Sequence, residues 1–115
     1  MPKIHRMRLN PAAFQNMKAG RKTVELRLYD AKRKKIRLGD TIIFIHNEDR
    51  HKKLRTRVTA LLIYPTFDAL IADLPAQMTG FPSKRKALQA VNAIYTARER
   101  RSFFALGLKI SLISS

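Results

Sequence analysis

Three charged side chains stand close together in the chain: Lys22, Glu25 and Arg27. Residues 23–29 alternate between polar and apolar types, which predicts a strand with one buried face. On that strand Glu25 and Arg27 share the polar face, about 6.5–7 Å apart, and Lys22 stands at the strand's entrance. The spacing predicts either a charged triad that lines a cleft or an ordinary surface ion pair, which contributes about 0–1 kcal/mol.

These side chains are of types that could act on a phosphodiester. Cleavage of RNA through its ribose 2′-hydroxyl needs a base, an acid and a clamp for the phosphate. Lys22 or Arg27 could hold the phosphate, and Glu25 or Tyr95 could move protons. The candidate catalytic residues are therefore Lys22, Glu25, Arg27 and Tyr95.

No metal or cofactor is expected from the sequence. The chain has no Cys, which excludes disulfides, thiolate zinc sites and iron–sulfur clusters. The three histidines, His5, His46 and His51, do not have the spacing of metal ligands, although the last two flank a turn and could approach each other. There is also no Gly-rich phosphate loop and no Ser/His/Asp pattern.

The charge of the chain is strongly unbalanced. Its 115 residues include 24 Lys or Arg and 8 Asp or Glu, so the net charge is +16. The length fits a single domain, residues 1–115, and the 45% hydrophobic content is enough for a core. Such a charge favours a polyanionic partner, either nucleic acid phosphates or anionic lipid, and selection for solubility is the alternative. The candidate nucleic-acid-binding residues are Lys22, Arg27, Lys32, Arg33, Lys34, Lys35, Arg55, Arg57, Lys84, Arg85 and Lys86.

A membrane role is not expected. No segment approaches the roughly 18 consecutive apolar residues of a spanning helix, and the N-terminal residues lack the apolar core of a signal peptide. Neither expected long helix combines a broad apolar face with a basic one outside a plausible core. The sequence therefore predicts a cytoplasmic protein without a membrane partner.

Seven elements are expected to position these side chains. Asn10, Thr66 and Ser83 are suitable N-caps, and Gly20 is a suitable helix stop. The expected order is a helix at 11–20, strands at 23–29, 41–45 and 53–63, helices at 67–74 and 84–95, and a strand at 105–112. Mostly antiparallel pairing through tight hairpins predicts a small open or closed barrel with helices at its rim.

The apolar pattern also assigns faces to three strands. The uninterrupted apolar run at 41–45 predicts a central strand that is buried on both faces. In the strand at 53–63, Leu54, Val58, Ala60 and Leu62 have the same parity and are expected on one face. In the last strand the inward side chains are expected to be Leu106, Leu108, Ile110 and Leu112.

The segment from Gly20 to Arg27 resembles the signature of the ASCH domain family. The family pattern is Gly-x-Lys-x-x-Glu-x-Arg, and its four defined positions match Gly20, Lys22, Glu25 and Arg27. The similarity continues through residues 28–30, 36–44 and 106–110. ASCH domains are related to the PUA-like barrels, so the resemblance implies an α+β fold: a small mixed or antiparallel PUA-like β-barrel with short helices at the rim.

The resemblance implies a cleft that receives RNA or a nucleobase-sized ligand. We expect an RNA-binding protein, in which Tyr29, Tyr64, Phe81 and Tyr95 could stack on unpaired bases. The alternative is a small hydrolase, either an ASCH-type ribonuclease or an amidohydrolase acting on a modified nucleoside. Some relatives of the second kind use a Lys, a Thr and a later Glu. Here Lys22 matches the Lys, the Thr position is Glu25, and residues 76–97 contain no acid.

Overall fold

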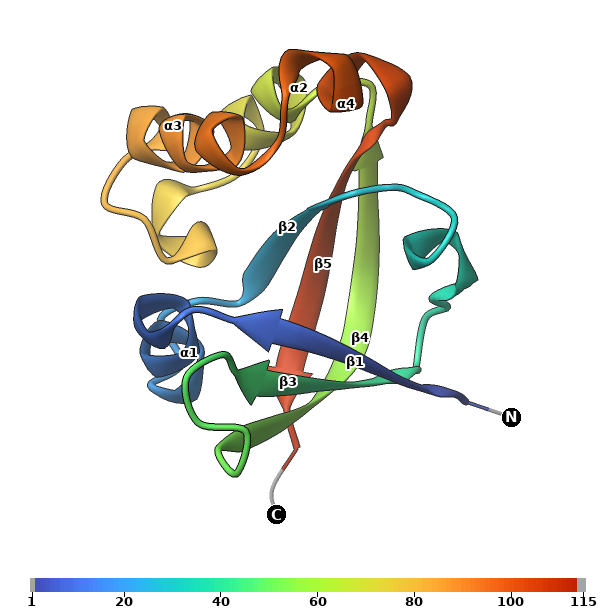
Figure 1. Ribbon diagram of the computed structural model, residues 1–115, viewed down its shortest axis with the longest axis vertical. Coiled ribbons are helices and arrows are strands. Elements are labelled where there is room, and N and C mark those ends of the chain that lie inside the picture. The colour runs from blue at the N-terminus through green and yellow to red at the C-terminus, as the bar shows by residue number, and fades with distance from the viewer. Residues whose placement is uncertain (1, 114–115) are drawn as a thin grey trace.

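The computed structural model describes residues 2–113 as one curled sheet with helices around it (Figure 1). The strands are β1 Ile4–Leu9, β2 Val24–Leu28, β3 Thr41–His46, β4 Lys53–Tyr64 and β5 Ala105–Leu112. The α-helices are α1 Pro11–Lys18, α2 Phe67–Ala72, α3 Lys84–Ile94 and α4 Ala97–Ser102. Two short 3₁₀ helices are η1 Arg33–Lys35 and η2 Ala76–Thr79.

The sheet is a half-barrel with mixed strand directions. Its order is β1-β3-β4-β5-β2, in which β1 and β3 are parallel and the other neighbours are antiparallel. Helices α2, α3 and α4 gather at one end of the sheet, and α1 lies beside the other part (Figure 1). The predicted α+β, PUA-like fold is confirmed, in its open form, with β1 and β2 as the two edges.

Two apolar clusters hold the sheet and helices together. The first packs α1 against β1, β3, β4 and β5 and contains Met7, Leu9, Phe14, Met17, Ile36, Ile42, Phe44, Val58, Leu106, Leu108 and Ile110. The second lies under α2 and α3 and contains Val24, Leu26, Leu28, Phe67, Leu70, Ile71, Leu74, Ala87, Val91 and Ala105. Because the apolar residues of β2 all belong to the second cluster, Glu25 and Arg27 point to the opposite side.

The caps form as predicted. The Asn10 side chain accepts a hydrogen bond from the Ala13 amide at 2.8 Å, and Ser83 accepts one from Lys86 at 3.1 Å. After α1, Gly20 has a φ of 80°, a left-handed conformation that favours glycine. The chain therefore turns sharply from α1 into the segment that carries the charged residues.

Among the strands and α-helices, β1 and α4 are absent from the sequence prediction. In β1, Met7 and Leu9 are buried between exposed Arg6 and Arg8, but this alternation is too short and too basic to stand out. Helix α4 buries none of its residues, so it has no apolar periodicity. Its clearest signal is a capping box, in which Thr96 and Glu99 bond to each other's backbone amides.

A β-bulge corrects the predicted faces of β4. Val58 pairs with Ile110 and Ala60 pairs with Lys109, so Thr59 is an extra residue in the ladder. An extra residue reverses the parity of the strand beyond it. Consequently Leu62 packs against the second cluster rather than beside Val58, and the prediction of one shared face is wrong there.

Two further burial predictions are wrong. Strand β3 does lie inside the sheet, but Ile43 and Ile45 are only partly buried, because that face of β3 is shared with exposed Arg55 opposite Ile43. At the end of β5, Leu112 is exposed rather than inward. The apolar run at 41–45 therefore correctly predicts that β3 lies inside the sheet. It overstates the burial of the face that carries Ile43 and Ile45.

Asp40 fastens β1 to the rest of the sheet. Its carboxylate accepts hydrogen bonds from the backbone amides of Lys3 and Arg37 at 3.0 and 2.9 Å, and His5 Nε2 lies 2.8 Å from Oδ2. Burial raises the pKa of Asp40, but these hydrogen bonds outweigh it and lower the pKa to about 2. Because the folded pKa lies below the ordinary value, this stabilisation is present above about pH 4 and is lost as the pH falls towards 2.

We expect Asp40→Asn to lower the free energy of unfolding by about 2 kcal/mol near pH 6. The difference between variant and wild type should shrink as the pH falls from 4 to 2. Urea unfolding at a series of pH values measures both effects. Asp68→Asn, which removes an exposed carboxylate from α2, is the control and should cost less than about 1 kcal/mol. A constant difference between Asp40→Asn and wild type over this range would contradict the assignment.

Candidate functional site

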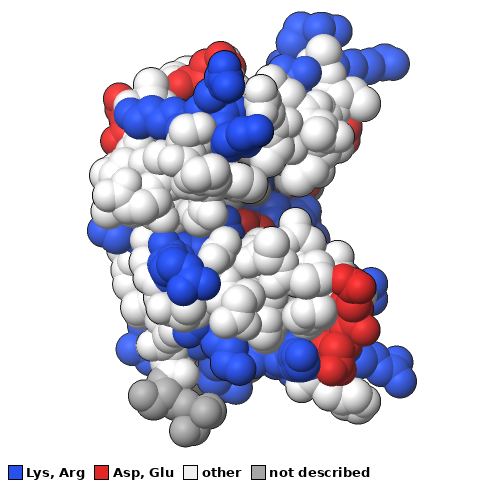
Figure 2. All heavy atoms as spheres, turned by 90° about the vertical axis from the view of Figure 1, so that its left-hand side faces the viewer, with Lys and Arg blue, Asp and Glu red and all other residues white. Residues whose placement is uncertain are grey.

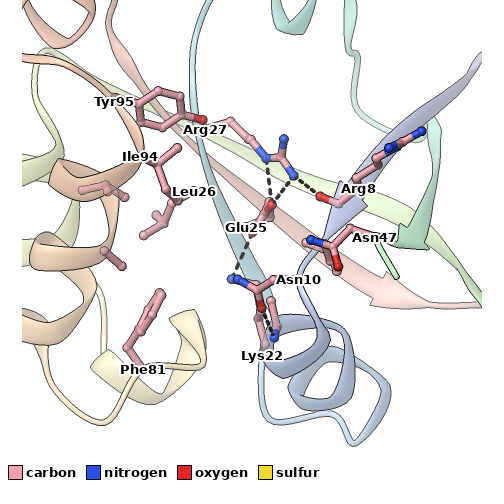
Figure 3. Close-up of a pocket in the computed structure, with 14 residues that line it drawn as sticks. Arg8, Asn10, Lys22, Glu25, Leu26, Arg27, Asn47, Phe81, Ile94 and Tyr95 are labelled. Atoms are coloured by element: carbon pink, nitrogen blue, oxygen red, sulfur yellow. Dashed lines mark hydrogen bonds and ion pairs between the residues drawn. The ribbon is translucent and has the colours of Figure 1, made fainter. Parts of the chain in front are cut away.

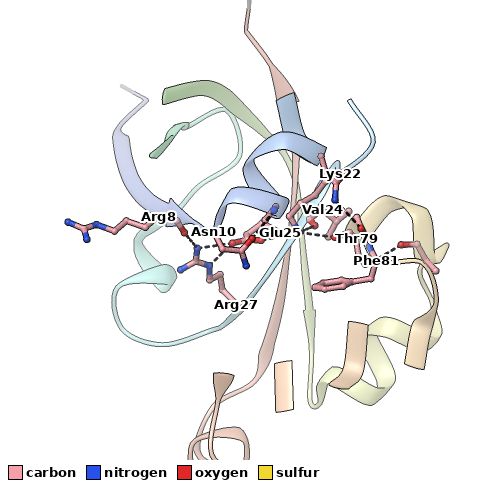
Figure 4. Close-up of polar contacts among 12 residues, drawn as sticks. Arg8, Asn10, Lys22, Val24, Glu25, Arg27, Thr79 and Phe81 are labelled. Atoms are coloured by element: carbon pink, nitrogen blue, oxygen red, sulfur yellow. Dashed lines mark hydrogen bonds and ion pairs between the residues drawn. The ribbon is translucent and has the colours of Figure 1, made fainter. Parts of the chain in front are cut away.

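The fold brings Lys22, Glu25 and Arg27 into one ion network (Figure 4). Lys22 Nζ lies 3.1 Å from Glu25 Oε1, and Arg27 donates to Glu25 Oε2 from Nη2 and Nε at 2.7 and 2.8 Å. The Lys22 and Glu25 side chains are 4% and 9% exposed. This is the triad that the spacing predicts, although both faces of β2 are covered, so it is far more buried than a surface ion pair.

The ammonium group of Lys22 is fully engaged within the protein. Besides Glu25 it donates to the Val24 carbonyl at 3.0 Å and to the Thr79 carbonyl at 2.9 Å. Gly80 closes over it with a φ of 83°, and a Cβ at Gly80 would meet the Lys22 Cβ at 3.2 Å. An ammonium has three protons to donate, so the expectation that Lys22 keeps a donor for a ligand is wrong. Lys22 instead positions Glu25.

Arg27 differs from Lys22 because part of its guanidinium is free. Its Nη2 also donates to the Arg8 carbonyl at 2.6 Å, which links β2 to β1 across the open side of the half-barrel. Within residues 2–113, Nη1 has no hydrogen-bond partner, and the side chain is 17% exposed. A positioned cationic N–H pair of this kind suits a phosphate or a carbonyl oxygen.

Arg27 lines a cleft of about 260 Å³. Phe81, Ile94 and Tyr95 line one wall, and the Arg27–Glu25 pair lies between them and the other wall (Figure 3). The opposite wall is polar and consists of Arg8, Asn10 and Asn47 (Figure 3). Figure 2 shows the molecule hollowed on this side, with acidic and basic atoms at the bottom of the hollow.

The protonation states of the cleft follow from its contacts. Burial raises the pKa of Glu25, but Lys22 and Arg27 outweigh it, so the pKa of Glu25 lies below its ordinary value. Burial raises the pKa of Tyr95, and the nearby Arg27 and Arg33 offset only part of this effect. Near neutral pH Glu25 is therefore a paired carboxylate with little tendency to accept a proton, and Tyr95 is a phenol that can donate a hydrogen bond.

The other predicted basic residues lie at different distances from the cleft. Lys32 and Arg33 line an adjoining groove of about 320 Å³ together with Arg6, Arg8 and Arg27, and Arg33 pairs with Asp30 at 3.1 Å. Arg55 and Arg57 are exposed on β4, outside the cleft lining.

The last predicted basic group, Lys84, Arg85 and Lys86, begins α3. There Lys84 Nζ donates to the Ala72 carbonyl at the end of α2 at 2.6 Å. The predicted basic set is thus divided rather than gathered at one site.

The polar wall is the part of the cleft that sequence reasoning misses. Arg8 belongs to the unpredicted β1, Asn47 directly follows β3, and Asn10 is expected only as a helix cap. Ile94, which is 67% exposed, also lines the cleft. The alternation of apolar Met7 and Leu9 with Arg6 and Arg8 could have predicted β1. On such a strand Arg8 lies on the exposed face.

The histidines take part in local contacts. His5 bonds to Asp40, and His46 accepts a hydrogen bond from the Glu48 amide at 3.1 Å. Among residues 2–113, no three His, Cys, Asp or Glu side chains form a group that could hold a metal ion.

Over the same part of the chain, no helix has both the length and the apolar character needed to cross a membrane.

Solved structures resemble this chain over nearly its whole length. The crystal structure of hypothetical protein PH0355 matches with a TM-score of 0.83 and 26% identity, covering 96% of this chain and 99% of that one. The solution structure of protein PF0455 from Pyrococcus furiosus matches with a TM-score of 0.75 and 24% identity, covering 97% and 99%. The crystal structure of ASCH from Zymomonas mobilis matches with a TM-score of 0.68 and 16% identity, covering 94% and 66%.

A search of curated proteins gives no significant match. The model of the ASCH domain matches residues 7–109, which include the Lys22–Glu25–Arg27 network, both walls of the cleft and all five strands at least in part. The sequence signature, the curled mixed sheet and the structural neighbours agree with this match. The chain therefore belongs to the ASCH domain family.

Proposed function

We propose that this protein binds single-stranded RNA and receives one unpaired base in the cleft between β1 and α3. The observation that carries the proposal is the state of Arg27 in a cleft with an aromatic wall and an amide-bearing wall. Its Nε and Nη2 are held by Glu25 and the Arg8 carbonyl, and its Nη1 has no hydrogen-bond partner within residues 2–113. The family as a whole is commonly associated with RNA binding, which supports the same choice.

The two walls suit the two chemical faces of a nucleobase. An unpaired base can stack on Tyr95 or Phe81, and its polar edge can meet the side chains of Asn10 and Asn47. Arg27 Nη1 can then donate to a base carbonyl or to the adjoining phosphate. The volume of about 260 Å³ is slightly below the roughly 300–1,000 Å³ of pockets for drug-sized ligands, which suits a single base or nucleoside.

The proton chemistry of the cleft favours binding over hydrolysis. Glu25 has both carboxylate oxygens occupied by cations and a lowered pKa, whereas a general base works best with a pKa near the operating pH. Tyr95 has a raised pKa and stays protonated. Binding needs neither group to change its protonation state.

The proposal is tested by incubating the protein with a panel of RNAs and modified nucleosides and analysing the products by mass spectrometry. Retention of unchanged RNA, lost in a variant with a disabled cleft, supports binding. New RNA fragments would make the protein a ribonuclease, and a deacylated nucleoside would make it an amidohydrolase. Failure to retain any RNA above the level of a neutral polymer would contradict the proposal.

The affinity for single-stranded RNA should fall steeply with salt. If six basic side chains contact phosphates, the slope of log affinity against log salt should be about −4, because each neutralised phosphate contributes about −0.7. Lys32→Glu with Lys34→Glu should make the slope less steep by about 1.4. Arg55→Glu with Arg57→Glu carries the same change in charge but lies on β4, and should have a smaller effect. Equal slopes for the two double variants would show that net charge alone governs binding.

A further inference from the structure

A cluster of exposed aromatic and apolar side chains lies outside the cleft. Phe104 is 53% exposed, Phe103 38% and Ile63 41%. Together with Tyr29, Lys34 and Ser102 they line a second cavity of about 440 Å³. We call Tyr29, Ile63, Phe103 and Phe104 the aromatic patch. Two consecutive exposed phenylalanines are unusual, since large apolar side chains are normally withdrawn from water.

The sheet fixes the patch in place. Ala105 at the start of β5 pairs with Tyr64 of β4 on one side and with Leu28 of β2 on the other. The residues next to these three are therefore brought to the same end of the sheet. The Tyr29 amide also donates to the Phe104 carbonyl at 2.8 Å, so the backbone beneath the patch is held by a hydrogen bond. The patch is a preformed surface on strand ends.

The charge around the patch indicates the chemistry of its partner. Lys34 Nζ lies 5.7 Å from the centre of the Tyr29 ring and lines the same cavity. The neighbouring Lys32 and Lys35 are exposed, and the nearby Asp30 is already paired with Arg33. A second copy of the chain would bring a net charge of +16 against another +16, which opposes association. Aromatic rings beside cations instead match an unpaired base with its phosphate.

A basic groove adjoins the cleft, and part of its lining comes from residues next to Lys34 in the chain. Arg27 lines both the cleft and the groove, and Lys32 and Arg33 lie in the groove directly before Lys34 in the chain. Figure 1 shows the segment after β2 running from the end of that strand to η1, below α4. The Nε atom of Arg33 is buried and has no hydrogen-bond partner within residues 2–113. Arg6, Arg8, Arg27, Lys32 and Arg33 thus line one groove that begins at the cleft, and Lys34 of the second cavity follows Arg33 directly in the chain.

We propose that the aromatic patch is a second base-stacking site for the same RNA strand, and that the groove carries the phosphates between the two bases. The proposal rests on the proposed function of the cleft and extends it from one base to a segment of several nucleotides. The specific occupant of the patch is an unpaired base stacked on Phe104 or Phe103, with its phosphate at Lys34.

The test compares short and long oligonucleotides. Fluorescence anisotropy is measured with labelled single-stranded RNAs of two to ten nucleotides, and wild-type affinity should rise with length until both sites are spanned. Phe104→Ala should weaken binding of the long RNAs about tenfold and leave binding of the dinucleotide unchanged, because stacking on the patch is lost only where a second base can reach it. Since Phe104 is exposed, thermal unfolding should be nearly unchanged.

Four further variants sharpen the result. Phe104→Trp should keep the affinity for long RNA, whereas Phe104→Leu, which is apolar but cannot stack, should lose it. Leu112→Ala removes another exposed apolar side chain, at the opposite end of β5, and should have no effect. Arg27→Lys should weaken binding of short and long RNAs alike, because it acts at the cleft.

The two proposals fail in different ways. A length-dependent affinity that Phe104→Ala leaves unchanged would overturn the aromatic patch and leave the cleft standing. Absence of binding at every length would overturn the proposed function itself. If sedimentation showed a dimer that Phe104→Ala dissociates, the patch would be a contact between copies of the chain, and the base-stacking role would be wrong.

Discussion

Glu25→Gln is expected to lower the free energy of unfolding by about 3–5 kcal/mol, a large part of the stability of a domain of this size. In the native protein the carboxylate lies between the buried ammonium of Lys22 and the guanidinium of Arg27. An amide would carry no charge to balance the two cations, and its NH2 group would have to face the donors of either Lys22 or Arg27. Urea unfolding measures the loss, provided that the slope of the free energy of unfolding against urea concentration is the same in variant and wild type.

A matched control separates this effect from a change in net charge. Glu48→Gln removes the same charge from an exposed loop and should change the free energy of unfolding by less than about 0.5 kcal/mol. Adding Lys22→Met to Glu25→Gln should cost less than the sum of the single changes, because both partners of the pair are then gone. Similar losses for Glu25→Gln and Glu48→Gln would contradict the buried ion network.

Arg27→Lys is expected to weaken RNA binding at least tenfold, which corresponds to about 1.4 kcal/mol. The arginine holds Glu25 and the Arg8 carbonyl with Nε and Nη2, and within residues 2–113 its Nη1 has no hydrogen-bond partner. A lysine carries a single ammonium group, which Glu25 would attract. It therefore cannot bond to Glu25 and the Arg8 carbonyl and also offer a planar N–H pair to a ligand. Anisotropy titrations at fixed salt measure the change.

Arg55→Lys provides the comparison, because it also keeps the net charge of +16 and lies on the exposed face of β4. It should change the affinity less than twofold, as a contact made only through charge tolerates the exchange. If Arg27→Lys and Arg55→Lys bound RNA equally well, Nη1 of Arg27 would not be the ligand contact and the cleft would not be the binding site.

The fold and the ion network are predictable because their signals are local. Alternation from Thr23 to Tyr29 sets the faces of β2, and that alone places Glu25 beside Arg27. The signature around Gly20 then identifies the family, and the family identifies the curled sheet. Caps such as Asn10 form because each satisfies an amide only three residues away.

The remaining features depend on contacts between distant residues. Lys22 loses its last free donor to the Thr79 carbonyl, 57 residues later in the chain, and no local pattern reports that bond. The polar wall depends on β1, whose register with β3 puts Arg8 opposite Ile45. The bulge at Thr59 has no marker in the sequence, since neither Gly nor Pro is present there.

The open sheet has a consequence for the behaviour of the protein at high concentration. An edge strand exposes backbone groups that can pair with an edge from another molecule, which is a common start of aggregation. Strand β1 has a neighbour on one side only, and exposed Arg6 and Arg8 are spaced along it. Like charges on two such edges repel each other, so these arginines protect the strand from self-pairing. Part of the excess positive charge thus allows the barrel to stay open without the molecules joining into fibres.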